Sequence, residues 1–172
     1  MGLEERLRSM KIDISVADGA VNATMMNRRV ILRIAEDYYD SVDVDTMCWD
    51  MSRLLDELFS SRRNRFFHAV SETVGYEIKS RMAPPTPRHG ELRMKQSGLI
   101  LGGASADGSI VIESIGLTDF RVVLEADTLE HLESSQFQRE FESAVQDLWL
   151  DHHEANQRLR RDLGLDSKIV GT

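Results

Sequence analysis

FQREFESAVQDLWLDHHEANQRLRRDL, residues 137–163, is the stretch from which the fold of this chain can be worked out. Its apolar residues recur at steps of three and four, the spacing of one face of an α-helix. They are Phe137, Phe141, Ala144, Val145, Leu148, Trp149, Leu159 and Leu163. So long an apolar stripe has to be covered, because burial removes apolar surface from water. The sequence therefore predicts a long amphipathic helix that packs against the rest of the chain.

A matching stripe lies 90 residues earlier in the chain. Its apolar residues stand at the positions equivalent to Phe137, Phe141, Ala144, Val145, Leu148 and Trp149. They are Met47, Met51, Leu54, Leu55, Leu58 and Phe59. This match predicts a second long helix, from about residue 47 to 75 with a continuation to Met82 left open, and it suggests one structural unit written twice.

The segments that precede the two helices also share an order. Alternating or β-branched runs predict strands at residues 10–16, 20–26 and 30–36, and again at 98–105, 109–115 and 120–125. An Asp-Gly pair, which favours a turn, follows the first strand of each set. Acidic connections at 37–45 and 127–133 lead to the helices. The expected N-caps are Thr46 or Asp45 and Ser134 or Ser135, and the expected terminating glycines are Gly75 and Gly164.

The predicted fold class is α/β (α+β), with two β-β-β-α repeats of antiparallel strands and one long helix each. All three prolines of the chain, Pro84, Pro85 and Pro87, fall in one short segment that favours a stiff spacer. We therefore expect repeat 1 at residues 1–82, a linker at 83–89 and repeat 2 at 90–172. Since one repeat cannot cover its own helix, we expect the two to pack as a pseudo-symmetric intramolecular dimer.

Composition and charge narrow the function classes. The single cysteine, Cys48, excludes an internal disulfide, and no apolar run has the length of a signal peptide or a membrane span. The net charge is −8; residues 1–82 carry 12 basic and 14 acidic side chains, and residues 90–172 carry 8 and 15. The acidic second half argues against binding of phosphates over a broad surface. A cytoplasmic protein without a membrane partner is expected.

No pattern of catalytic or metal-binding residues emerges. The run Asp151-His152-His153-Glu154 looks like a ligand set, but neighbouring residues on a helix point about 100° apart and cannot share an ion. Ala106-Asp107-Gly108-Ser109 lacks the Walker pattern and is expected to be a hairpin turn. We therefore expect no enzyme activity, no metal and no cofactor.

Two groups of residues are candidates for binding. Arginines can contact nucleic-acid phosphates, and the candidates are Arg28, Arg29, Arg62, Arg63 and Arg65. Phe66, which follows the second group, is expected on the apolar stripe. Trp49 is rotated by 160–200° from the line of Met47, Met51 and Leu54, so it is the candidate for an exposed protein interface.

The predicted unit resembles the YbaB/EbfC family of small bacterial nucleoid-associated proteins. The resemblance lies in the hairpin from Asp107 to Ile112, the turn and strand from Gly116 to Glu125, the acidic connection at 127–133 and the helix that carries Phe137 and Phe141. Residues 19–75 follow the same pattern less closely. It implies an α/β dimer fold, DNA binding and no enzyme activity; similar modules occur in actinobacterial proteins associated with type VII secretion. This chain departs from the family by holding two copies and by its acidic charge.

The leading prediction is a protein-interaction adaptor or accessory factor in a bacterial cytoplasm, with a link to secretion left open. The alternative is a nucleoid-associated protein that binds DNA without sequence preference. The sequence names no protein partner and leaves further homo-oligomerisation open.

Overall fold

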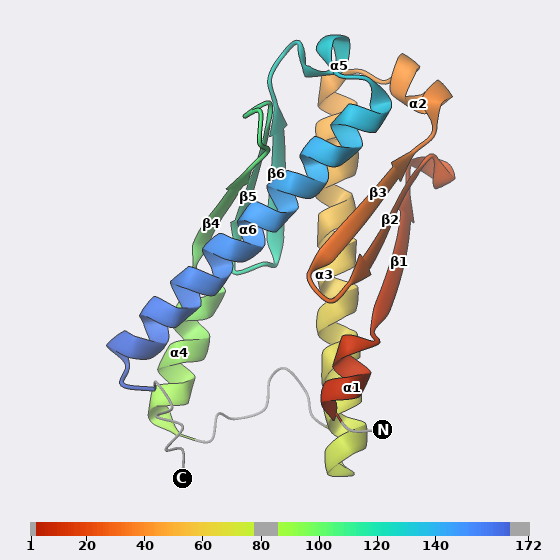
Figure 1. The fold of residues 1–172 in the computed structure, drawn as a ribbon. Coiled ribbons are helices and arrows are strands. Elements are labelled where there is room, and N and C mark those ends of the chain that lie inside the picture. The colour runs from red at the N-terminus through yellow and green to blue at the C-terminus, as the bar shows by residue number, and fades with distance from the viewer. Residues whose placement is uncertain (1–2, 78–85, 166–172) are drawn as a thin grey trace.

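The computed structural model describes residues 3–77 and 86–165 (Figure 1). The first half contains α1 (Leu3–Arg8), β1 (Lys11–Val16), the 3₁₀ turn η1 (Ala17–Gly19), β2 (Val21–Met26), β3 (Arg29–Ile34), α2 (Glu36–Ser41) and α3 (Val44–Val74). The second half contains α4 (Pro87–Ser97), β4 (Ile100–Ala104), β5 (Ile110–Ile115), β6 (Asp119–Leu124), α5 (Thr128–His131) and α6 (Ser134–Asp162). Apart from η1, both halves follow the same order of helices and strands.

Each half forms one antiparallel sheet, with the strand orders β1-β2-β3 and β4-β5-β6. We call them sheet A and sheet B. All the predicted strands are present, with ends within two residues of the expected ones. The predicted Asp-Gly turns are confirmed: Asp18 and Gly19 have φ of 52° and 93°, and Gly108 has φ of 80°. Glycine adopts such angles without the steric cost that other residues carry.

The long helices begin earlier than predicted because other residues cap them. Asp43 is the N-cap of α3, and its carboxylate accepts hydrogen bonds from the Thr46 amide and hydroxyl, both at 2.8 Å. Glu133 is the N-cap of α6, where it forms a capping box with Gln136. A capping side chain must precede the first helical residue. The predicted caps were wrong, because they lie inside the helices: Asp45 and Thr46 in α3, and Ser134 and Ser135 in α6.

Helix α3 ends at Val74, where Gly75 takes the left-handed conformation, as predicted. The suggested continuation of this helix to Met82 is therefore wrong, because the helix stops before Gly75. Residues 78–85, with Pro84 and Pro85, lie outside the described part of the chain. Helix α4 begins at Pro87, inside the predicted linker, because Thr86 caps it and proline fits the first helical position.

The two acidic connections contain short helices, α2 and α5, which the sequence did not predict. Tyr39 of α2 is buried, and its hydroxyl donates to the carbonyl of Leu132 at 2.8 Å. Burial raises the pKa of Tyr39 to about 12. Tyr38 hydrogen-bonds to Asp50 of α3. The bond of Tyr39 joins the two connections at one end of the molecule, and that of Tyr38 joins α2 to α3 (Figure 1).

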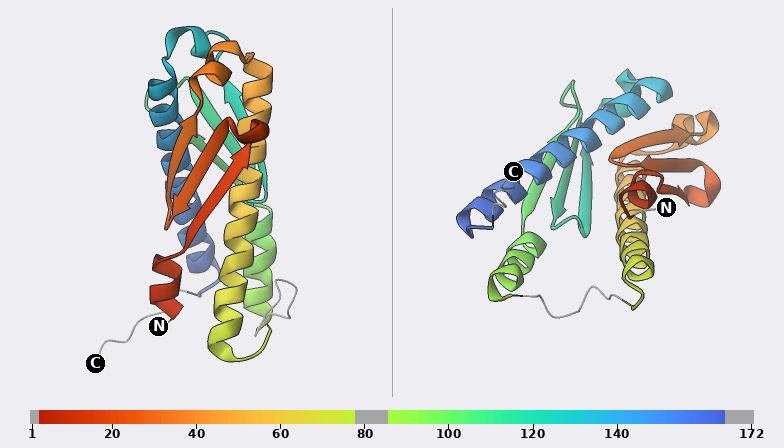
Figure 2. Two further views of the ribbon diagram at one scale, coloured as in Figure 1. Left: turned by 90° about the vertical axis from the view of Figure 1, so that its right-hand side faces the viewer. Right: turned by 60° about the horizontal axis from the view of Figure 1, so that its bottom comes forward.

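Two sheets and two long helices alternate around one core. Helix α3 packs against β1 of its own half and β6 of the other half, and α6 packs against β4 of its own half and β3 of the other. Figure 2 (left) shows sheet A toward the viewer, sheet B behind it, and the two long helices on either side. The elements thus close a ring in the order α3, sheet A, α6, sheet B.

The apolar stripes face the interior of this ring. All the stripe residues from Met47 to Phe59 and from Phe137 to Trp149 are at most 4% exposed. Leu159 and Leu163 are only half-buried, so the second stripe is shorter than expected. Within residues 3–77 and 86–165, no helix combines the length and apolar character needed to cross a membrane.

Side chains of the long helices bind the backbone of the facing edge strands. The Val122 amide of β6 donates to Ser52 Oγ of α3 at 2.9 Å. At the positions 90 residues away, the Leu32 amide of β3 donates to Glu142 Oε1 of α6, also at 2.9 Å. The amides of Gly102 and Ala104 in β4 donate to Asp151 and Asp147 of α6. These bonds satisfy strand amides that would otherwise remain open at the sheet edges.

Helix α6 and strand β4 approach each other closely at Gly103. A Cβ atom at this position would stand 2.3 Å from the Ala144 carbonyl oxygen and 2.5 Å from the Leu148 nitrogen. Gly103 therefore lets α6 lie directly on β4. The pair Gly102-Gly103, which weakened the strand prediction, marks this close approach.

We expect Gly103→Ala to lower the free energy of unfolding by about 1–3 kcal/mol, because two backbone segments must move apart. Gly102→Ala is the matched control, since its Cβ would have no neighbour closer than 4.0 Å. Urea denaturation measures both. Equal stability of the two variants would contradict the close approach at Gly103.

Candidate functional site

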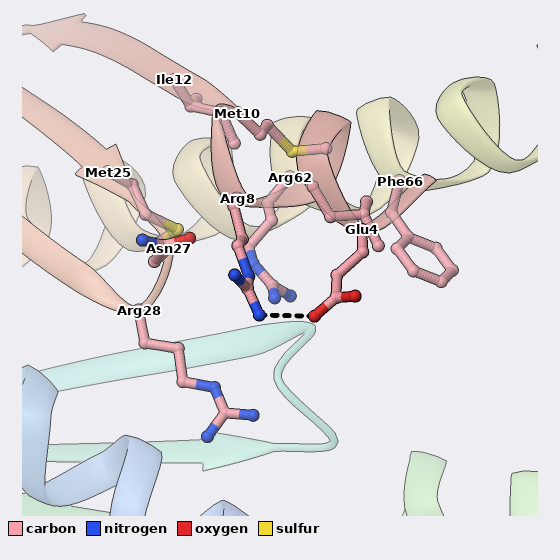
Figure 3. Close-up of a pocket in the computed structure, with 10 residues that line it drawn as sticks. Glu4, Arg8, Met10, Ile12, Met25, Asn27, Arg28, Arg62 and Phe66 are labelled. Atoms are coloured by element: carbon pink, nitrogen blue, oxygen red, sulfur yellow. Dashed lines mark hydrogen bonds and ion pairs between the residues drawn. The ribbon is translucent and has the colours of Figure 1, made fainter. Parts of the chain in front are cut away.

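The structure divides the five candidate arginines among separate places instead of gathering them in one. Arg28, in the turn between β2 and β3, and Arg62, on α3, line one pocket with Arg8 of α1 (Figure 3). Arg63 and Arg65 line a separate depression, and Arg65 Nη1 donates to the Lys11 carbonyl at 2.7 Å. Arg29 pairs in register with Met26 at one end of sheet A. A single surface formed by all five is thus not present, while nucleic-acid contact by any of them stays a prediction.

The pocket has an apolar floor and a cationic rim. Its volume is about 210 Å³. Figure 3 shows the side chains of Arg8, Arg28 and Arg62 extending toward the same space, with an ion pair between Arg8 and Glu4. The apolar lining comes from α1, the residue before β1, β1, β2 and α3, namely Leu7, Met10, Ile12, Met25 and Phe66. Phe66 is 40% exposed, so its predicted place on the buried stripe was wrong.

Arg62 is held against an aromatic ring. Its guanidinium lies over Trp149, 4.9 Å from the ring centroid, in a cation–π contact. Burial, and then the neighbouring Arg28, lower the pKa of Arg62. Among the described residues, no carboxylate lies within ion-pair distance of Arg28 or Arg62. The positive charge at this pocket is therefore only partly balanced.

His152 of α6 lies beside this group of arginines. Its ring packs edge-on against Trp149 with centroids 5.7 Å apart, and Asn156 Nδ2 lies 2.7 Å from His152 Nε2. Burial lowers the pKa of His152 most; Arg28, Arg62 and His153 lower it further, and Asp151 opposes them. The remainder of the run 151–154 does not converge on it, since Asp151 binds the Gly102 amide and His153 approaches Gln157. In the described ranges, no three His, Cys, Asp or Glu side chains form a metal-ligand group.

A different kind of surface covers the outer face of sheet B. Ile100, Val111, Ile115 and Val123 are exposed there by 85%, 37%, 48% and 37%. Ile100 pairs with Ile115, and Val111 pairs with Ala104 and Val123. The middle row is polar, where Glu113 pairs with Arg121, and Asp119 stands next to Ile115 in the row of Ile100. We call the four apolar residues the sheet B patch.

The corresponding face of sheet A is largely polar. Its exposed side chains include Lys11, Asp13, Asn22, Arg29 and Arg33, with Met26 and Ile31 as the large apolar exceptions. An antiparallel sheet commonly exposes such a polar face to water. The sheet B patch is thus a feature of one half only.

Trp49 is 69% exposed, as its position on the helix predicted. Two residues of α3 face β6 beside it: Cys48 receives a backbone hydrogen bond from Leu124, and Ser52 receives one from Val122. Trp49 lies about 100° further around the helix than Cys48, away from the core. Burial raises the pKa of the Cys48 thiol, which is consistent with a structural role. Trp49 therefore borders the side of α3 that meets sheet B.

The sequence analysis missed the sheet B patch, although a signal was present. The strands ILGGA, IVIESI and DFRVVL carry apolar residues at both odd and even positions. Such strands are expected to be buried on both faces. One face of sheet B packs on the core, so the other implies an additional covering surface.

Comparisons with known proteins add no assignment: no family model, curated protein or solved structure matches the chain.

We expect an NMR titration to place the pKa of His152 below the ordinary value of 6.5, and that of His131, which Asp127 raises, above it. Because the fold favours neutral His152, its contribution to stability is present above about pH 6.5 and is lost as the pH falls. Arg28→Gln should raise the pKa of His152 and leave that of His131 unchanged. An unchanged His152 would show that Arg28 does not act on it.

Proposed function

We propose that this chain is a non-enzymatic YbaB/EbfC-like protein that binds another macromolecule, most directly as a protein-interaction adaptor or accessory factor in a bacterial cytoplasm. The observation that carries the proposal is the sheet B patch, an apolar sheet face exposed to solvent on one half of the chain. Exposed apolar surface of this kind typically marks a protein interface. A role in secretion would be one setting for such an adaptor.

The proposed architecture is a tandem duplication that folds as a pseudo-symmetric intramolecular dimer. Supporting it, the bonds Val122 to Ser52 and Leu32 to Glu142 are equivalent under an offset of 90 residues. Phe59 and Trp149 share this offset and stack on each other with centroids 5.0 Å apart. Equivalent residues of two subunits meet in this way at a twofold axis.

The chemistry of the face defines its partner. The patch offers branched aliphatic side chains, and the half that carries it, residues 90–172, has 15 acidic against 8 basic groups. A protein with an apolar patch bordered by lysine or arginine is complementary to such a surface. We therefore propose a protein partner of this kind.

The size of the face supports a partner that reaches beyond it. Three strands of about six residues cover roughly 300 Å². A stable interface needs about 800 Å² on each partner. The face alone is too small, and a second copy docking face to face would meet the same limit. The proposed partner therefore extends beyond the sheet, with Trp49 on α3 as the large side chain at its border.

Matched lysine substitutions test the proposed interface. Val123→Lys and Ile31→Lys replace residues that are both 37% exposed, each on the third strand of its sheet. We expect Val123→Lys to reduce capture of the partner from the native cell at least tenfold, because a lysine opposes an apolar surface with a basic border. Ile31→Lys should capture as the unchanged protein does.

The folding of both variants is checked by circular dichroism. Trp49→Ala should weaken the same capture. The interface is refuted when Val123→Lys and Ile31→Lys capture the same proteins to the same extent.

DNA binding is the second proposed candidate, since the pocket gathers Arg8, Arg28 and Arg62 on one side of the molecule. A gel shift at 50 and 200 mM salt tests it. If DNA is bound through phosphates, affinity falls steeply between these concentrations. The net charge is −8, and Arg62 and Arg63 line different depressions. We therefore expect no gel shift at either salt concentration. A salt-sensitive shift that Arg28→Gln weakens would favour DNA over the adaptor function.

A further inference from the structure

The pocket of Arg28 and Arg62 differs from the equivalent region of the second half. Under the proposed duplication, Leu7, Arg62 and Phe66 correspond to Gln96, His152 and Asn156. In the second half these residues bond to one another: Gln96 Nε2 donates to Asn156 Oδ1 at 2.8 Å, and Asn156 Nδ2 lies 2.7 Å from His152 Nε2. These contacts link the side chains of α4 and α6.

The helices above the two regions also differ. Helix α4 has 11 residues and buries Leu92, whereas α1 has 6 residues and buries none. At the positions that correspond to Gln96, His152 and Asn156, the pocket beside α1 has Leu7, Arg62 and Phe66. An open pocket of about 210 Å³ remains there.

We propose that this pocket binds a small amphipathic anion, with its carboxylate or phosphate at Arg28 and Arg62 and its apolar body on Met10, Ile12, Met25 and Phe66. The site lies apart from the sheet B patch and goes beyond the proposed adaptor function. The pocket stands on its own geometry even if the duplication fails.

The charges at the rim select the head group. Guanidinium groups form paired, charge-assisted hydrogen bonds with carboxylates and phosphates. Glu4, the acidic residue among those that line the pocket, is paired with Arg8 and leaves Arg28 and Arg62 to the ligand. The ring of Trp149 holds Arg62 from below, so its guanidinium is already oriented.

The volume of the pocket limits the size of the apolar part of the ligand. At about 30 Å³ for a water-sized group, 210 Å³ accommodates about seven such groups. A carboxylate with six carbon atoms in all matches this size. Long acyl chains would exceed the pocket.

Hexanoate is the probe for the test, followed by ¹H–¹⁵N NMR titration of the full chain. We expect saturable shifts at residues 7–12, 25–28 and 62–66, with a dissociation constant of about 1 mM or below. Hexyl phosphate should bind as well, which extends the chemistry from carboxylates to phosphate monoesters. Hexanol, which lacks the charge, and acetate, which lacks the body, should bind at least tenfold more weakly.

Variants locate the binding. Arg28→Gln should weaken hexanoate binding about tenfold or more, because it removes a charge-assisted bond. Arg63→Gln is the matched control on the neighbouring depression and should have no effect. A triple variant, Leu7→Gln with Arg62→His and Phe66→Asn, should close the pocket as in the second half and abolish binding.

Three results would overturn the proposal. Equal affinity for hexanoate and acetate would indicate an adventitious ion only, and equal affinity for hexanoate and hexanol would remove the arginines from recognition. Absence of shifts at 10 mM hexanoate would show that the pocket does not bind this class. Since Val123 lies outside the pocket, Val123→Lys should bind hexanoate normally, so failure of this site and of the adaptor interface are separable.

Discussion

The hydrogen bond from the Val122 amide to Ser52 Oγ, and its counterpart from Leu32 to Glu142, are the contacts on which the ring depends. A three-stranded sheet has two edges with open backbone groups, which could otherwise pair with strands of other chains. Along α3, residues four apart advance by about 6 Å, which nearly equals the advance of two residues in a strand. Ser52 and Asp56 can therefore bind the amides of Val122 and Phe120 in sequence. The helix takes the place of a fourth strand.

This arrangement explains why neither half is a plausible folding unit alone. The β6 edge is satisfied by α3, and the β3 edge by α6, so each sheet takes part of its covering from the other half. Phe59, Phe120 and Trp149 meet between the halves, where ring contacts span both long helices and β6. Separating the halves would expose these rings and the edge amides together. Burial of the aromatic surface and pairing of the edge amides thus favour a single cooperative ring.

The strongly periodic parts of the chain were predicted well, because one physical rule determines them. The stripes of both long helices and the alternation of the strands follow from burial of one face, and the turns at Asp18-Gly19 and Gly108 follow from positive φ. The caps were missed by one to three positions, since Asp43 and Glu133 are acidic residues within acidic segments and no local rule separates them from their neighbours. Arg28 and Arg62 line the same pocket because of the way in which α3 lies against sheet A. The periodicity of the sequence does not report this arrangement. Periodicity placed Phe66 on the buried stripe, whereas the structure places it in the pocket beside α1, 40% exposed.

The interior of the ring constrains both halves alike, whereas their outer surfaces are free to differ. Phe59 and Trp149, which stand 90 residues apart, both lie in the core and are at most 4% exposed. On the outside, one half combines a polar sheet face with an open cationic pocket, and the other combines an apolar sheet face with the linked side chains of Gln96, Asn156 and His152. A symmetric dimer of identical chains would carry every surface twice. A single chain with two halves can place one binding surface on each, and it is in these differences that we locate the proposed functions.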